Sequence, residues 1–109
     1  MHEALFTDKL QKAKGISTME IAKTLLDHGI HPMTVYFPLV VQGALLIEPT
    51  ESEPKETLDE FIKIMRNIAD EIENGKGEAL KSNPQNAPRK KLDEVKAARE
   101  PKLTWADLQ

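Results

Sequence analysis

Seven apolar side chains between residues 58 and 72 recur at steps of three and four, and this repeat constrains the fold more than any other feature. They are Leu58, Phe61, Ile62, Met65, Ile68, Ala69 and Ile72. This spacing places an apolar stripe along one face of an α-helix, while charged residues occupy the other face. Pro54 suits the first turn of such a helix, and Gly75 stands just past its last turn.

This helix needs other elements to cover its stripe, because burying these side chains releases less free energy than ordering about 20 residues costs. A second helix is indicated by an S-x-x-E capping box at Ser17 and Glu20. Gly29 is suited to close that helix, and Pro32 prevents its continuation. The sequence therefore predicts a helix over residues 17–28.

Three short runs supply candidate strands at residues 2–8, 34–37 and 44–47. The second and third are β-prone and are separated by a proline and a glycine, as in strands joined by a loop. Residues 9–15 are polar and end in glycine, which is typical of a connection. The order of elements predicts an α+β fold, a small β-α-β-β-α domain over residues 1–75.

The character of the chain changes after this domain, and we expect residues 76–109 to form an extended polar tail. Pro84 and Pro88 interrupt any long element in it, and a short helix is expected near residues 91–99. Trp105 carries a large apolar group far along this tail. It either covers the sheet of its own domain or packs on a partner chain or a missing domain, and we favour the partner contact.

Composition excludes several classes of function. A net charge of -3 and a pI near 5.6 argue against binding to nucleic acid, which usually requires a basic face. The chain has no cysteine, so disulfides and thiolate metal sites are excluded. No apolar run approaches the roughly 20 residues that span a bilayer, so we expect no membrane association and a cytoplasmic location.

The segment HGIHPMTVYFPLVVQGALLIEPTESEPKETLDEF, residues 28–61, resembles the carboxy-terminal part of glycine dehydrogenase (decarboxylating), the pyridoxal-phosphate-dependent P-protein of the glycine cleavage system. The stretches MHEALF, IAKTLLDHG and KKLDEVKAARE resemble the same family in the same order, so nearly the whole chain is covered. The chain departs from the family pattern at Met33, where a second proline is usual. The matching residues of the segment are His31, Pro32, Thr34, Tyr36, Phe37, Pro38, Ile47, Glu48, Pro49, Thr50, Glu51, Glu53, Lys55, Glu56, Leu58 and Asp59.

The resemblance implies the small carboxy-terminal domain of a fold-type I pyridoxal-phosphate enzyme, the second subunit of a two-chain form. The complete enzyme would release CO2 from glycine and transfer the aminomethyl group to the lipoyl group of H-protein. Its implied partners are the large domain of the same enzyme, subunit 1 and lipoylated H-protein. The Schiff-base lysine belongs to the large domain in this family, so the chain alone is expected to bind no pyridoxal phosphate and to be catalytically inert.

Two residues are candidates for the wall of the substrate pocket, because small domains of this fold supply residues from the loop between helix and sheet. His31 and Thr34 occupy that loop, and His31 could donate a proton or a hydrogen bond near neutral pH. The alternative for His31 is a cap on the preceding helix, where an imidazolium is favoured at the negative end.

Other polar groups have simpler interpretations. Glu48 and Glu51 could act as paired carboxylates, but Thr50, Glu51 and Ser52 are better explained as caps on the long helix. The three histidines lack a convincing metal-ligand spacing with nearby carboxylates, so no metal site is predicted. A second hypothesis for the whole chain is a freestanding protein-interaction module derived from the same enzyme.

Overall fold

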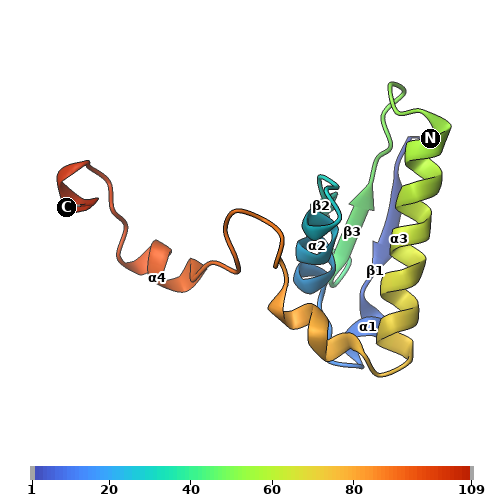
Figure 1. Cartoon of the computed structure of the whole chain (residues 1–109), viewed down its shortest axis with the longest axis horizontal. Coiled ribbons are helices and arrows are strands. Elements are labelled where there is room, and N and C mark those ends of the chain that lie inside the picture. Colours follow the sequence, from blue (N-terminus) through green and yellow to red (C-terminus); the bar gives the residue numbers. More distant parts are fainter. Residues whose placement is uncertain (1, 109) are drawn as a thin grey trace.

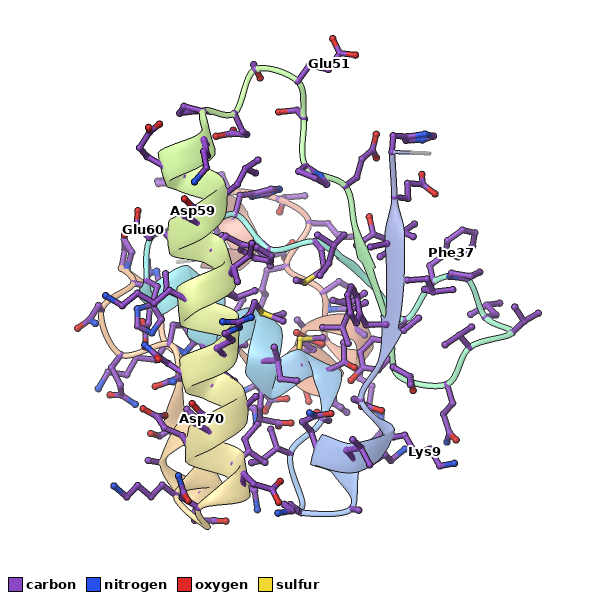
Figure 2. The ribbon with its side chains drawn as sticks, turned by 90° about the vertical axis from the view of Figure 1, so that its right-hand side faces the viewer. Lys9, Phe37, Glu51, Asp59, Glu60 and Asp70 are labelled. Carbon is purple, nitrogen blue, oxygen red and sulfur yellow. The ribbon has the colours of Figure 1, made fainter. Side chains whose placement is uncertain are left out.

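A three-stranded antiparallel sheet, covered on one side by two helices, forms the body of the protein (Figure 1). The computed structural model describes residues 2–108. The strands are β1 (Ala4–Thr7), β2 (Thr34–Val35) and β3 (Ala44–Ile47), in the spatial order β1-β3-β2. Both views place α2 (Thr18–Asp27) and α3 (Lys55–Glu73) on the same side of this sheet (Figures 1 and 2). The α+β prediction and its element order are confirmed.

The helix α2 begins where the capping box predicts. Ser17 is the N-cap, and the Glu20 carboxylate accepts a hydrogen bond of 2.8 Å from the Ser17 backbone N–H. Burial raises the pKa of Glu20, but the hydrogen bonds from Ser17 outweigh burial and lower that pKa overall. The helix is followed by Gly29 at a φ of 73°, a conformation in which glycine has no steric penalty.

The long helix α3 has nearly the predicted bounds, but its buried face differs from the predicted stripe. Ile64, which the predicted stripe omits, is 7% exposed, whereas Ile62 is 49% exposed. Ile68 and Ile72 are buried as predicted. Sequence periodicity defines a broad apolar stripe, and the positions of the sheet and α2 decide which side of that stripe faces the core.

The start of α3 corrects two details of the prediction. Pro54 is the N-cap of the helix rather than part of its first turn, and no side chain caps it. The predicted caps at residues 50–52 are therefore wrong. The Thr50 and Ser52 hydroxyls instead hydrogen-bond each other at 3.0 Å in the preceding turn.

The strand predictions differ in accuracy. The strand over residues 44–47 is confirmed as β3, and the run at 2–8 contains β1. The strand predicted at 34–37 is wrong beyond Val35, because Tyr36 takes a φ of 57°, outside the extended region. Residues 9–15, predicted as a connection, contain the short helix α1 (Lys9–Lys12).

The core lies between the sheet and the helices. Leu45 of β3 packs there against side chains from α2 and α3, and Leu80 reaches it from beyond the predicted domain. The buried hydrophobic cluster comprises Ile16, Ile21, Leu25, Leu45, Ile64, Ile68, Ile72 and Leu80.

A buried polar junction joins three segments beside this core. The carboxylate of Asp8, a residue 2% exposed, accepts a hydrogen bond of 3.0 Å from the Thr18 N–H. The carbonyl of Gly43 accepts bonds from the Asp8 N–H at 3.1 Å and from the Thr18 hydroxyl at 2.8 Å. The junction fixes the end of the β2–β3 loop to the start of α2.

Residues after 75 are partly packed on this body. The 3-10 helix η1 (Gly77–Ser82) buries Leu80, and the Asn83 side chain donates a hydrogen bond of 3.0 Å to Thr24. The Asp27 carboxylate accepts backbone hydrogen bonds from Gln85 at 2.6 Å and Asn86 at 2.8 Å. The division of the chain at residue 75 stays a prediction, with these contacts lying across it.

The last part of the described chain forms an arm that extends away from the body (Figure 1). It carries α4 (Glu94–Arg99), within the predicted range 91–99, and η2 (Ala106–Leu108), and neither contains a buried residue. Within residues 2–108, no helix is both long enough and apolar enough to cross a membrane.

Candidate functional site

A surface depression of about 520 Å³ lies where the turn after α2, the end of β3 and the start of α3 meet. His28 and His31 line it on one side, and Glu48, Glu53 and Glu60 line it on the other. Ile47 and Phe61 contribute apolar surface. We call this feature the His31 depression.

Local structure explains why His31 reaches this depression. The Ile30 N–H bonds to the Leu25 carbonyl at 3.0 Å, and Ile30 and Met33 pack against the core. The chain between these two apolar anchors passes over the surface, so His31 is exposed. The alternative role of His31 as a helix cap is not what the structure shows, because the C-cap of α2 is His28.

The chemistry available in the depression is that of exposed imidazoles and carboxylates. Imidazoles donate and accept hydrogen bonds, and carboxylates accept hydrogen bonds from amines and hydroxyls. The depression is therefore suited to small polar groups with hydrogen-bond donors. Its three carboxylates disfavour anions.

Thr34 lies elsewhere. It is the first residue of β2, pairs with Leu46 of β3 and is exposed. It does not line the His31 depression. The structure thus places the two predicted pocket residues on different surfaces of the domain.

Glu48 and Glu51 do not form a pair. Glu48 lines the depression, whereas Glu51 stands at the tip of the β3–α3 connection and points away from the body (Figure 2). The alternative of paired carboxylates for acid–base chemistry has no support in this arrangement.

One cluster of possible metal ligands was missed by sequence reasoning. His2, Glu3 and Glu48 each offer one ligand atom, and these atoms lie within 4.8 Å of one another. The pairing of Ala4 with Ile47 brings Glu3 beside Glu48, so strand register is the signal that finds it. All three residues are exposed, and exposed acidic groups gather often without an ion. We assign no metal site to this cluster.

A second, apolar groove of about 490 Å³ runs between the sheet and α3. Phe6 of β1 and Ile62 and Met65 of α3 line it, and Phe6 is 54% exposed. The helical spacing of apolar residues predicted that Ile62 and Met65 belong to one stripe of the helix. It did not indicate that part of this stripe is exposed to solvent.

Trp105 lies on the arm and is 75% exposed. The Asp107 carboxylate holds the turn around it by accepting hydrogen bonds of 2.9 Å from the Thr104 hydroxyl and backbone N–H. These bonds, the hydroxyl's foremost, lower the pKa of Asp107. Trp105 does not cover the sheet of its own domain, so the first of the two interpretations of this residue is wrong. Its contact with a partner stays a prediction.

Comparison with known proteins adds a strong similarity. Residues 1–89 match the family described as glycine dehydrogenase, C-terminal domain. A probable glycine dehydrogenase (decarboxylating) subunit 2 of Caulobacter vibrioides is 51% identical over 105 residues, covering 96% of this chain and 20% of the relative. A protein of the same description from Kosmotoga olearia is 50% identical over 97 residues, covering 89% of this chain and 20% of the relative. The chain spans about one fifth of the length of these curated relatives.

Proposed function

Because the chain belongs to the family of glycine dehydrogenase C-terminal domains, we propose that it acts as the carboxy-terminal domain of a glycine dehydrogenase (decarboxylating) subunit 2. The observation that carries this proposal is the 51% identity over 96% of the chain. The complete enzyme is an oxidoreductase that releases CO2 from glycine and passes the aminomethyl group to the lipoyl group of H-protein. We place it in the cytoplasm, with subunit 1 and the remainder of subunit 2 as partners. The remainder is the part of the subunit that this chain does not span.

The His31 depression does not fit pyridoxal phosphate, the cofactor of the complete enzyme. That cofactor requires a lysine amine for an imine, a partner for its ring nitrogen and donors for its phosphate. The His31 depression is lined by no lysine, and Glu48, Glu53 and Glu60 would repel a phosphate. We therefore assign the cofactor to the remainder, and the isolated chain is inert in this proposal.

His31 is our candidate for a contribution to the substrate pocket. Its exposed imidazole in a depression lined by carboxylates supports a role in holding the amino group or a proton of the substrate. Thr34 is our second candidate for a contribution to the substrate pocket, and it lies on another surface of the domain. Neither role requires this chain to hold the cofactor.

A chimeric enzyme tests the proposal. The segment of the Caulobacter vibrioides subunit 2 that matches this chain is replaced by residues 1–109, and glycine-dependent CO2 release is measured with subunit 1 and H-protein. We expect activity comparable to the parent enzyme and none from the isolated chain. A soluble, assembled chimera without activity would contradict the proposal.

The same chimera tests the role of His31. His31→Ala is expected to raise the KM for glycine or lower kcat by a factor of about 10 or more, as loss of one positioned hydrogen bond does. His2→Ala is the matched control and should leave kcat and KM unchanged, because His2 is an exposed histidine that does not line the depression. Unchanged kcat and KM in His31→Ala would remove His31 from the pocket.

We further propose that Trp105 contacts the remainder or subunit 1. A large aromatic side chain that is 75% exposed on an arm is typical of a residue buried by a partner. Trp105 is the single tryptophan, so the emission of the isolated chain reports on it alone. Emission of a water-exposed indole, quenched by iodide, is expected, and a blue-shifted, unquenchable signal would count against the contact.

The alternative function is a freestanding interaction module, and the exposure of Leu39 at 85% and Val40 at 92% fits such a module as well as a domain detached from its enzyme. A module of this kind would bind an unrelated protein and would not restore activity in the chimera. The chimera therefore discriminates between the two functions.

A further inference from the structure

The sheet has a face on the side opposite α2 and α3, and that face carries leucine side chains (Figure 2). Leu45 points to the helices, so the neighbouring Leu46 and its cross-strand partners Leu5 and Thr34 point the other way. Leu5 is 44% exposed. We call this surface the outer face.

The composition of the central strand β3 is that of a strand buried on both sides. A sheet with one wet face alternates apolar and polar residues, whereas a doubly covered sheet has continuous apolar strands. All four residues of β3, Ala44–Ile47, are apolar. The leucines of the outer face are therefore typical of an interior surface, although Leu5 is exposed and Leu46 only partly buried in this chain.

The β2–β3 loop extends this surface with exposed apolar side chains. Phe37 is 58% exposed, Leu39 85% and Val40 92%. Figure 2 shows Phe37 on the side of the sheet opposite α3. A continuous run of this kind is rare on a protein surface that stays in contact with water.

Both ends of this loop are held in place by hydrogen bonds. The Tyr36 N–H bonds to the Ala44 carbonyl at 2.9 Å, and the Thr7 hydroxyl bonds to the Gln42 carbonyl at 2.7 Å. The buried junction of Asp8, Thr18 and Gly43 fixes the end of the loop. The loop thus presents its apolar residues in a fixed arrangement, which reduces the entropy lost on binding.

We propose that the outer face and residues 36–41 dock against an apolar surface of the remainder of subunit 2. This inference rests on the proposed function. The occupant follows from length, because the chain spans 20% of the Caulobacter vibrioides relative and the rest of that subunit has no counterpart here. An interface between two parts of one subunit is permanent, and permanent interfaces are more apolar than transient ones.

Hydroxyl-radical labelling with mass spectrometry tests this docking in the chimera and in the isolated chain. Labelling of Phe37 and Leu39 is expected to fall several-fold in the chimera. Leu10 is the internal reference, because it is 74% exposed on α1 and lies outside the outer face. Its labelling is expected to change much less.

A variant pair provides a second readout. Leu39→Asp with Val40→Asp should leave the melting temperature of the isolated chain unchanged, because both side chains are exposed. In the chimera the same change should release the domain, seen as a separate, lower thermal transition and faster proteolysis at the joint. Leu10→Asp is the matched control and should leave the chimera with its original transition.

The outcomes separate this inference from the proposed function. Unchanged labelling of the loop in an active chimera would overturn the docking and leave the function standing. An assembled but inactive chimera whose loop is protected would support the docking and count against the function. Protection that appears in the isolated chain as its concentration rises would identify a second copy as the occupant. Protection by vesicles of anionic lipid would identify a membrane surface, and either of these results would overturn the docking.

Discussion

Asp8, Thr18 and Gly43 show how a few residues far apart in the sequence decide the local structure. The Asp8 carboxylate accepts a hydrogen bond from the Thr18 N–H, and the Gly43 carbonyl accepts one from the Thr18 hydroxyl, inside the protein, where unpaired polar groups are costly. No local pattern indicated this junction, because its members are 10 and 25 residues apart along the chain. Sequence reasoning identified Ser17 and Glu20 instead, since a capping box is a local signal.

The first prediction concerns Gly43. Its φ is 61°, and an added Cβ would lie 1.9 Å from a carboxylate oxygen of Asp8. Gly43→Ala should lower the free energy of unfolding by about 3 kcal/mol or more, through backbone strain and loss of the junction. Urea denaturation measures this change. Gly29→Ala is the matched control, with a φ of 73° and no atom within 4 Å of the added Cβ. Equal losses of unfolding free energy in the two variants would show that the Asp8 carboxylate is free to move away from the added Cβ.

The second prediction concerns pH. Burial raises the pKa of Asp27, but the hydrogen bonds that its carboxylate accepts from the backbone N–H groups of Gln85 and Asn86 together outweigh burial and lower that pKa below its ordinary 3.8. A lowered pKa in the folded state means stabilisation above pH 3.8 that is lost as pH falls through the lower, folded value. Amide exchange protection of Gln85 and Asn86 should therefore persist at neutral pH and decline below pH 3.8. Asp27→Asn should weaken this protection and remove its pH dependence, and Asp70→Asn should leave it as in the wild type.

At the scale of elements, local signals predicted where helices begin and end better than which side chains they bury. The predictions for α2, α3 and β3 rest on a capping box, helical spacing and flanking glycine or proline, all of which act within a few residues. The helix η1 was not predicted, because it is stabilised by Leu80 entering a core built by other elements. The His31 depression is formed by three segments that are separate in the sequence. The sequence therefore indicated His31 as a candidate but did not indicate which residues lie beside it.

The third prediction follows from the face that α3 buries. Ile64→Ala should cost about 2 to 5 kcal/mol of stability, because it opens a cavity in the core. Ile62→Ala should cost about 1 kcal/mol or less, because nearly half of its surface is already in water. The two isoleucines lie two positions apart on one helix and are 7% and 49% exposed. Thermal and urea unfolding of both variants measures the difference, and the reverse order would mean that α3 is rotated.

At the scale of the whole molecule, the protein is a compact body with a protruding arm. Its radius of gyration is 15.9 Å, whereas a compact domain of this length has about 13 Å. The arm accounts for the excess, since the residues from 91 to 108 are exposed. The family match ends at residue 89, close to where the packed part of the chain ends.

The fourth prediction concerns truncation. Removal of residues 90–109 should leave the free energy of unfolding within about 1 kcal/mol of the full chain, because the main loss is an ion pair between Lys91 and Glu20. Removal of residues 76–109 should cost about 3 kcal/mol or more, because Leu80 then leaves the core open. Urea denaturation of the two shortened chains measures their free energies of unfolding. Equal stabilities of the two shortened chains would support the predicted domain limit at residue 75.

The pairing of β1 with β3 also sets an order of events during synthesis of the chain. Residues 4–7 meet residues 44–47 and have no earlier partner in the sheet. Contacts between distant segments form late, since the closure of a long loop precedes any gain from pairing. Leu5 and Phe6 therefore lack their partners in the sheet until about forty further residues have been synthesised. This strand is therefore one of the last parts of the domain to be paired, and until then its apolar side chains are a site that a chaperone can bind.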